Sequence, residues 1–458
     1  MTRSLPTADA AAGSVLAPGL RVATLGIVGL VSLIAFEAMA VATALPSAVA
    51  ELRGLAWYGW SFTALLVTSV VGMVAAGELA DRVGARRPLL VGVLTFLTGL
   101  LVAGLAGGMA VFVLGRALQG VGVGLLAVVM YVLVGEAYPE RLRPAVFGAI
   151  SAAWVLPALV GPVVAGGLAE GPGWRWVFLG LVPFVLAGGA LLIPLSRRLD
   201  RPADPPAARP RRWAAAVLVG TGVAAVQWAA QAPSWPRLPV AAGGLTLLAA
   251  GLRVLLPSGT VAVRRGVPAV VAFRGLLAGA FFSVESLVPL TLTLVHGYSA
   301  TAAGVPLTGG ALGWAAASWW QGRRPDAARH RLVRTGFGLV AVAAGGMALV
   351  SQPWTPAWVV YPLWLAGGIG MGLAMASIGV LLLRLTPPPQ RGANSSALQI
   401  SDSVASALCI GLAGALVAAS ARDVLPLPAA GATLDLVMAG VAITGATLAG
   451  RVRPATPA

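Results

Sequence analysis

The chain has 458 residues, of which 58% are hydrophobic and 10% charged, and its mean hydropathy is +0.89. This composition excludes an ordinary soluble enzyme and is typical of a protein that crosses a membrane many times. The net charge of +16 does not indicate a nucleic-acid partner, because the arginines are spread over short segments between apolar runs and form no single patch.

The predicted secondary structure is all-α, since a helix needs about 20 mainly apolar residues to cross a bilayer. No cleavable signal peptide precedes the first run, and the one cysteine, Cys409, allows neither an internal disulfide nor a metal site. Fourteen apolar runs satisfy the length condition: 21–45, 59–80, 88–107, 110–133, 145–169, 175–195, 213–231, 238–256, 268–295, 302–321, 333–351, 357–384, 395–419 and 430–450.

The arginine distribution predicts the orientation of these spans. With the N-terminus inside, 25 arginines fall in inside segments, 4 in outside segments and 2 within spans. Basic residues accumulate on the cytoplasmic side of membrane proteins. We therefore expect both termini in the cytoplasm and an even number of spans.

The longest inside segment, 196–212, is rich in proline and arginine and is predicted to be a solvated linker. It separates an N-terminal bundle of six helices, 1–195, from the rest. An inserted two-helix hairpin, 213–256, and a second six-helix bundle, 257–458, complete the chain. The predicted architecture is thus six plus two plus six.

The two bundles resemble each other in sequence. Glu37 precedes Pro46 in the first span, and Glu285 precedes Pro289 in the ninth. Internal repeats are common in transporters, whose binding site lies at the membrane midplane between the halves. The repeat predicts that Glu285 faces Glu37 across such a site.

Glu37 and Arg116 are the first membrane-embedded charges. A charged group at mid-bilayer costs roughly 2.5–3.5 kcal/mol or more, so each needs a partner or a function. Glu37 lies nine residues before Pro46, about 13 Å deep, and Arg116 lies about 9–10 Å into its span. The two can meet across a helix interface, either as a structural salt bridge or as a carboxylate that exchanges protons.

Two further segments have unusual patterns. The loop 77–90 reads GELADRVGARRPLL, in which Gly84 permits a left-handed turn and Asp81 can cap a helix or pair with an arginine. The segment 154–168 reads WVLPALVGPVVAGGL, and its prolines and glycines predict a kinked helix with a smooth face for a partner helix.

The loop resembles the signature between helices two and three of the major facilitator superfamily. The segment 114–124, with Arg116, Gln119 and Gly120, is similar to that family's helix-four motif, and WRW at 174–176 resembles the start of helix six in its fourteen-helix drug:proton antiporters. The aromatic pair Trp174 and Trp176 is expected to anchor the outer interface.

The resemblance implies roles for these residues. It implies a major facilitator fold with pseudo-symmetric halves, proton transfer at Arg116, a conformational latch and an antiporter motif. The implied latch residues are Gly77, Asp81, Arg82, Gly84, Arg86 and Arg87, and the antiporter motif falls on Pro157, Gly161, Pro162, Gly166 and Gly167. The chain departs from the fourteen-helix branch in carrying Glu37 where an aspartate is usual, and its loop 321–331 lacks the signature order.

Other side chains are candidates from their positions. Asp402 lies among hydroxyl residues in 394–406 and is a candidate for proton coupling together with Glu37, Glu285 and Arg116. Aromatic rings can stack on flat lipophilic compounds, although most membrane tryptophans are interfacial anchors. The candidate substrate-binding residues are Glu37, Tyr131, Trp154, Phe281, Glu285 and Trp314.

Together these features predict a bacterial plasma-membrane transporter, not an enzyme, that acts as a monomer without a cofactor. It would export drug-like or amphipathic molecules, lipophilic or cationic, in exchange for protons by alternating access, with membrane lipid around it. The alternative is a dedicated exporter of one secondary metabolite or lipid. An enzyme acting on lipid would need a histidine cluster, whereas the chain has two isolated histidines.

Overall fold

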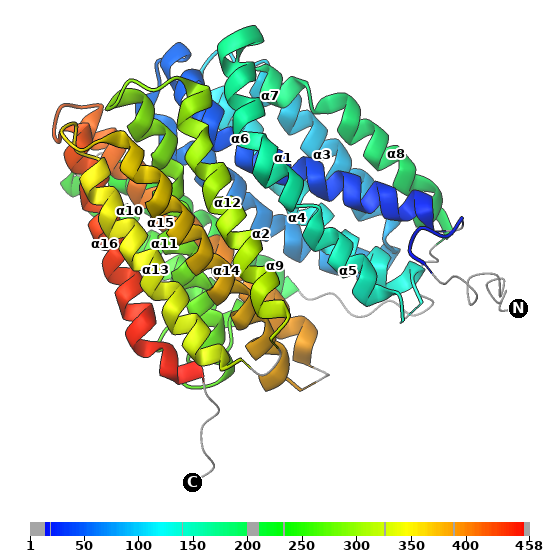
Figure 1. Cartoon of the computed structure of the whole chain (residues 1–458). Coiled ribbons are helices and arrows are strands. Elements are labelled where there is room, and N and C mark those ends of the chain that lie inside the picture. Colours follow the sequence, from blue (N-terminus) through cyan, green and yellow to red (C-terminus); the bar gives the residue numbers. More distant parts are fainter. Residues whose placement is uncertain are drawn as a thin grey trace, which may run out of the picture.

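The structure is a computed structural model that describes residues 14–18, 20–139, 141–198, 210–231, 234–324, 327–387 and 390–452. Within these ranges the protein consists of helices joined by short turns (Figure 1). The predicted all-helical architecture is therefore observed.

The first six crossing segments make up one helical bundle. Two of them are interrupted: the fifth consists of α5, α6 and the π-helical turn η3, and the sixth of α7 and α8. Their bounds are α1 Arg21–Glu51, α2 Tyr58–Val83, α3 Arg86–Gly104, α4 Met109–Ala137, α5 Arg143–Ala152, α6 Val155–Leu168, η3 Ala169–Gly173, α7 Trp176–Leu179 and α8 Val182–Arg198.

A two-helix hairpin follows, and then a second bundle of six helices. The predicted linker 196–212 lies largely outside the described residues, since α8 extends to Arg198 and α9 begins at Pro210. The helices are α9 Pro210–Gln231, α10 Leu238–Leu255, α11 Val267–Leu294, α12 Ala300–Gly322, α13 Arg329–Val350, α14 Val360–Leu385, α15 Arg391–Ser420 and α16 Leu427–Leu448.

Thirteen of these segments are long and apolar enough to cross a membrane. The helix α12 is long enough, with 23 residues, but it does not reach the same hydropathy. Its glycines, tryptophans and single glutamine lower its hydropathy, and its packing against α6, α11 and α14 places it inside the bundle.

The two bundles have the same internal arrangement. In the first, α2 and α3 pack on α4, and α1 packs on α6 and α8. In the second, α12 and α13 pack on α14, and α11 packs on α15 and α16. Pro46 in α1 and Pro289 in α11 lie inside corresponding helices. This correspondence supports the interpretation of the chain as two repeats of six helices.

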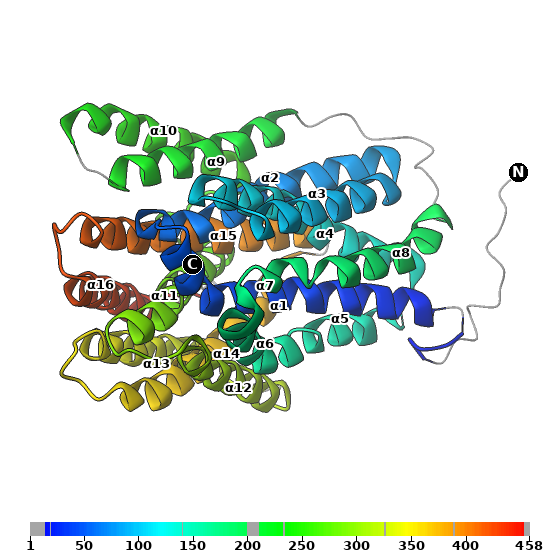
Figure 2. The same ribbon diagram turned by 90° about the horizontal axis from the view of Figure 1, so that it is seen from above.

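The bundles meet along two seams. On one side α6 packs against α12, and on the other α2 packs against α15. The hairpin α9–α10 lies beside the second seam, where α9 contacts both α2 and α15 (Figure 2). It is therefore attached to both bundles at once.

We name the two ends of the molecule after glycines in their loops. The Gly54 end carries the turns 52–54, 105–108, 295–299, 351–356 and 421–426, and the Gly84 end carries 84–85, 138–142, 257–266 and 323–324. The prediction from the arginine distribution makes the Gly84 end cytoplasmic.

Candidate functional site

Glu37 and Arg116 form an ion pair between α1 and α4. Both side chains are almost completely buried, at 1% and 3% exposure. The guanidinium also donates from Nε to the carbonyl oxygen of Ser61 at 2.8 Å, and from one amino group to the side-chain oxygen of Gln119. The structure thus brings together the two charges that the depth estimate placed side by side.

This network joins three helices in the centre of the first bundle. Ser61 belongs to α2, Glu37 to α1, and Arg116 and Gln119 to α4. The amide nitrogen of Gln119 is buried and has no hydrogen-bond partner among the described residues. The unpaired amide N–H beside this buried charge pair can donate to an acceptor atom of a polar ligand, because that hydrogen bond remains to be made.

Glu285 lies in the middle of α11 and is half-buried. In the described part of the chain it has neither a hydrogen bond nor an ion pair. No hydrogen bond links it to Glu37 among the described residues, and the arrangement of the two acids across a site stays a prediction. Glu285 is therefore the acidic side chain within the apolar helices that depends most on a proton or a ligand for neutralisation.

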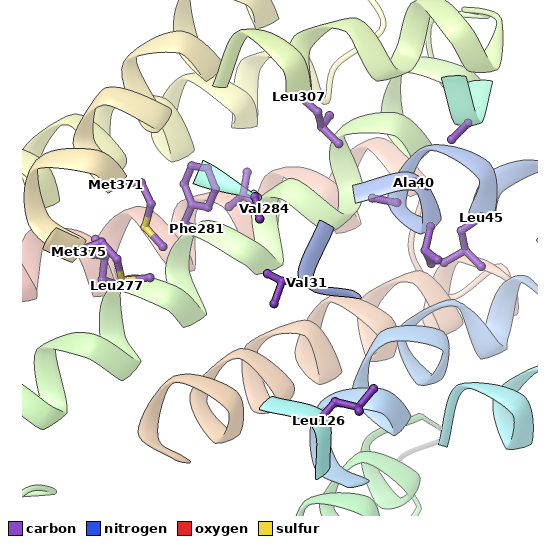
Figure 3. Packing of buried hydrophobic residues seen from close by; sticks show 14 of the residues in the cluster. Val31, Ala40, Leu45, Leu126, Leu277, Phe281, Val284, Leu307, Met371 and Met375 are labelled. Carbon is purple, nitrogen blue, oxygen red and sulfur yellow. The ribbon is translucent and has the colours of Figure 1, made fainter. Parts of the chain in front are cut away.

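Aromatic rings gather one turn from Glu285. Phe281 stacks on Trp364 with ring centroids 4.9 Å apart, and it meets Trp314 edge to face at 6.1 Å. Figure 3 shows Phe281 in the same part of the core as Met371 and Met375 of α14. Since residues four apart share a helix face, the carboxyl of Glu285 and this aromatic group occupy neighbouring positions on α11.

Tyr131 and Trp154 do not belong to this aromatic group. The ring of Tyr131 packs on Phe147 of α5 with centroids 5.3 Å apart, and the residue is 61% exposed. Trp154 precedes α6 and is 43% exposed. Of the four predicted aromatic residues, the structure brings only Phe281 and Trp314 into contact with each other.

Asp402 forms an ion pair with Arg274. Its carboxylate accepts a hydrogen bond of 2.6 Å from Nε of Arg274, so that an ion pair links α15 to α11. Gln399 lies within 3.4 Å of the same guanidinium. The sequence analysis named Asp402 as a candidate for proton coupling but assigned it no partner, and this arginine comes from another helix.

The loop 77–90 connects α2 to α3 at the Gly84 end. Gly84 has a φ of 77°, as a glycine turn requires. Asp81, Arg86 and Arg87 are exposed and make no hydrogen bond or ion pair with any described residue, while Arg82 lies 3.6 Å from Glu78 of its own helix. The expected latch residues are thus present and disengaged in this conformation.

Part of the 154–168 segment packs on α12, through Gly166 and Pro162, while Gly161 faces Met39 of α1. A Cβ on Gly166 would lie 2.4 Å from Cα of Thr301, and Pro157, Gly161 and Pro162 are buried. Gly167, in contrast, has open space around it. Small residues allow this close approach of two helices.

Contacts between the two bundles gather at the Gly54 end. The carboxylate of Glu170 accepts a hydrogen bond of 2.7 Å from the backbone N–H of Thr301, in the first turn of α12. A Cβ on Gly59 would lie 2.5 Å from Cα of Gly414. The Tyr58 hydroxyl donates to the carbonyl oxygen of Ser286. These contacts join the two bundles near the Gly54 end in this structure.

The WRW segment is correctly placed at this end, but one of its expected roles is wrong. Trp176 is 51% exposed, whereas Trp174 is 2% exposed and packs its ring against Phe112 and Phe178. Its indole N–H donates to Glu51, which also pairs with Arg175. Trp174 therefore ties helices together and does not anchor the interface.

Two buried polar groups were missed from the sequence. Asp435 in α16 is 2% exposed and accepts a hydrogen bond from Ser351. Its position in an otherwise apolar run is the same signal that drew attention to Glu37. Gln321 bonds to Arg329 and Ser377, and so stabilises the Gly84 end of the second bundle without the signature loop order.

Comparisons with known proteins agree with this architecture. The sequence model described as Major Facilitator Superfamily matches residues 27–410. A solved structure of an auto-inhibited POT family peptide transporter superposes with a TM-score of 0.69 at 17% identity, over 95% of this chain and 97% of that one. At this identity the likeness concerns the fold.

Three relatives are similar in sequence. An uncharacterized MFS-type transporter of Mycobacterium tuberculosis is 31% identical over 83% of this chain and 57% of its own length. A probable multidrug-efflux transporter of the same species is 37% identical over 33% and 32%, and an acurin A biosynthesis cluster transporter of Aspergillus aculeatus is 29% identical over 56% and 42%.

The chain matches 57% of the length of the first of these relatives and 42% of the length of the Aspergillus aculeatus transporter. The match to the family model nevertheless covers most of the chain and agrees with the fold described above. The chain therefore belongs to the major facilitator superfamily, a family of transporters and not of enzymes, and is a multi-pass membrane protein.

Proposed function

We propose that this transporter exports lipophilic or cationic small molecules in exchange for protons. The observation that carries the proposal is Glu285: a half-buried carboxyl without a described partner, one turn from the Phe281–Trp314–Trp364 aromatic group. A carboxyl in such a place is neutral when protonated and attracts a cation when it is not. Competition between a proton and a substrate for one carboxyl is a direct means of exchange.

Glu37 and Arg116 have a supporting role in this proposal. Their ion pair links α1 to α4 in the bundle opposite Glu285. Protonation of Glu37 would remove the charge that holds the guanidinium, and Arg116 would then keep its bonds to Ser61 and Gln119. The loss of Glu37 as a partner of Arg116 is thus the proposed link between proton binding and helix movement. Asp402 is already paired with Arg274, so the proposal does not assign coupling to it.

Alternating access is proposed to use the contacts at the two ends. The bundles are in contact near the Gly54 end, and Asp81, Arg86 and Arg87 at the Gly84 end have no hydrogen bond or ion pair with a described residue. In the proposed opposite conformation the Gly54 contacts would break and the latch loop would find partners. With the Gly84 end in the cytoplasm of a bacterial cell, as the arginine distribution predicts, the Gly54 contacts would lie on the outer side of the membrane.

A dedicated exporter of one product is the second candidate. It is favoured by the similarity to a transporter of the acurin A biosynthesis cluster, whereas the similarity to a probable multidrug-efflux transporter favours broad export. The range of compounds that move protons separates the two.

The test is substrate-dependent proton movement in proteoliposomes loaded with a pH-sensitive dye. Native protein is compared with Glu285→Gln, Glu37→Gln and Glu285→Asp on a panel of lipophilic cations and neutral drugs. Glu51→Gln serves as the matched control, because Glu51 is an acid of α1 that is 52% exposed and pairs with Arg175 at the Gly54 end.

We expect native protein, Glu285→Asp and Glu51→Gln to move protons with several compounds, and Glu285→Gln to abolish the exchange. Proton movement with one compound only would support the dedicated exporter. Proton-coupled transport by Glu285→Gln at the native rate would refute the assignment of this residue.

A further inference from the structure

Asp435 is an acid that the proposed exchange does not use. It lies in α16, eight residues after Leu427, and hence about 12 Å from the start of the helix at the Gly54 end. The residue is 2% exposed. Its described hydrogen-bond partner is the hydroxyl of Ser351, which donates to Oδ2 over 3.0 Å.

No basic group neutralises this carboxyl within the described part of the chain. The helices α11, α13 and α15 pack against α16, and none of the charged residues described in them makes an ion pair or hydrogen bond with Asp435. In α11 these are Arg274 and Glu285, in α13 residues 329–334 at the Gly84 end, and in α15 Arg391 and Asp402. The helix α16 contains no other charged residue.

At the Gly54 end, Nε2 of His296 is hydrogen-bonded at 2.7 Å to the carbonyl oxygen of Val350, the residue before Ser351. Arg422 and Asp423 lie in the exposed turn after α15. None of these groups makes an ion pair with Asp435. An ionised carboxylate there would be buried without a counter-charge, which costs several kcal/mol.

The packing around Gly431 shows how Asp435 is placed relative to Glu285. A Cβ on Gly431 would lie 2.7 Å from the hydroxyl oxygen of Ser351 and 4.0 Å from that of Thr291. The helices α11 and α16 run in opposite directions, and Gly431 lies beside Thr291. Asp435 is one turn after Gly431 in α16, and Leu287 is one turn before Thr291 in α11, so Asp435 lies at the level of Leu287. Leu287 and Glu285 are about 200° apart around α11, so the two acids lie on opposite faces of this helix.

The oxygens around Asp435 fit a proton better than a metal ion. Ser351 uses its hydrogen to bond the carboxyl, and the hydroxyl of Thr291 is the other side-chain oxygen near that turn. Hard cations such as Ca²⁺ or Mg²⁺ need about six oxygen ligands. No group of three or more His, Cys, Asp or Glu side chains that would hold a metal is found among the described residues.

We propose that Asp435 is a second proton-binding site of this protein, separate from Glu285, and that its proton stabilises the packing of α16 on α11 and α13. Loss of the proton leaves a charge between three apolar helices and weakens that packing. This inference does not depend on the transported compound, so it can fail or succeed independently of the proposed exchange.

The test needs no substrate. Infrared difference spectra of the full-length protein in lipid, recorded between acid and alkaline pH, report protonated carboxyl groups through their C=O stretching bands. Asp435→Asn is expected to remove one band. Ser351→Ala is expected to shift that same band to higher wavenumber, because it removes the hydrogen bond to Asp435. Glu285→Gln is expected to affect a different band.

Thermal unfolding provides the second measurement. The midpoint of native protein is expected to fall as the pH rises, and Asp435→Asn, which mimics the neutral form, is expected to reduce that fall. Asp423→Asn, in the exposed turn at the same end, is the matched control and should behave like native protein. An unchanged carboxyl spectrum in Asp435→Asn, a band that persists at every pH at which the protein is folded, or stabilisation that follows Na⁺ concentration instead of pH would overturn the proposal.

Discussion

Removal of Arg116 is the most informative perturbation, because it separates a structural ion pair from a functional one. In Arg116→Met the carboxylate of Glu37, which is 1% exposed, loses its counter-charge. Breaking a buried pair in this way costs about 3–5 kcal/mol of unfolding free energy. At about 1.4 kcal/mol per power of ten, the folded-to-unfolded ratio falls by roughly two to four powers of ten.

The double variant Glu37→Met and Arg116→Met should recover most of this loss. Replacement of a buried pair by apolar residues of similar volume is often neutral or stabilising by about 1–4 kcal/mol. Part of the gain is offset, because the carbonyl of Ser61 and the side-chain oxygen of Gln119 lose a donor. We expect a coupling energy of about 2–3 kcal/mol between the two positions.

Stability is measured by denaturant unfolding in detergent, followed through the fluorescence of the 14 tryptophans, and transport by the dye-loaded proteoliposomes described above. We expect the double variant to be folded but unable to exchange protons for substrate. Recovery of both stability and exchange would show that the pair is only structural. An unchanged unfolding free energy in Arg116→Met would refute the estimate of its energetic role.

Three further predictions concern the two ends and the second bundle. Gly59→Val places a side chain against Cα of Gly414, so we expect the two bundles to separate at the Gly54 end. Electron-paramagnetic resonance distances between spin labels on the loops of that end, in a cysteine-free background, should increase. Unchanged distances would contradict the role of this contact in holding the bundles together. Glu170→Ala removes the acceptor for the backbone N–H of Thr301 in the first turn of α12, a hydrogen bond worth about 0.5–2 kcal/mol. The fraction of molecules separated at the Gly54 end should therefore rise by about 2- to 30-fold in the same measurement, and by less in Glu170→Gln. Asp402→Asn leaves Arg274 without its ion-pair partner and should lower the unfolding free energy by about 1–3 kcal/mol while proton exchange persists; abolished exchange would instead place Asp402 in the coupling mechanism.

The number of helices and the Glu37–Arg116 contact were predictable because both depend on distance along the chain. Apolar runs of sufficient length define the crossing segments, although α12 shows that a small, glycine-rich helix can escape a hydropathy criterion. The depth of a residue follows from its place in a straight helix. Two buried charges at similar depth were therefore expected to meet, and they do.

The side of a helix on which a residue lies was much harder to predict. In a membrane the lipid-facing and protein-facing sides are both apolar, so the sequence has little periodicity to distinguish them. Trp174 was expected at the interface and is buried, whereas Tyr131 and Trp154 were expected in a site and are exposed. The partner of Asp402 was missed for the same reason, since Arg274 lies 128 residues away in the sequence.

The position of the hairpin has a consequence for how compounds enter from the lipid. Val219 and Val223 of α9 pack with Val70 of α2 and with Ile400 and Val404 of α15, and this apolar cluster covers the α2–α15 seam. Acyl chains and dissolved lipophilic molecules are kept from that flank of the protein. Among the described residues no further helix covers the α6–α12 seam in this way, and Leu156 and Val163 of α6 and Leu312 of α12 are exposed. The two flanks of the protein are therefore unequal: two extra helices cover one flank, and apolar side chains of α6 and α12 are exposed on the other.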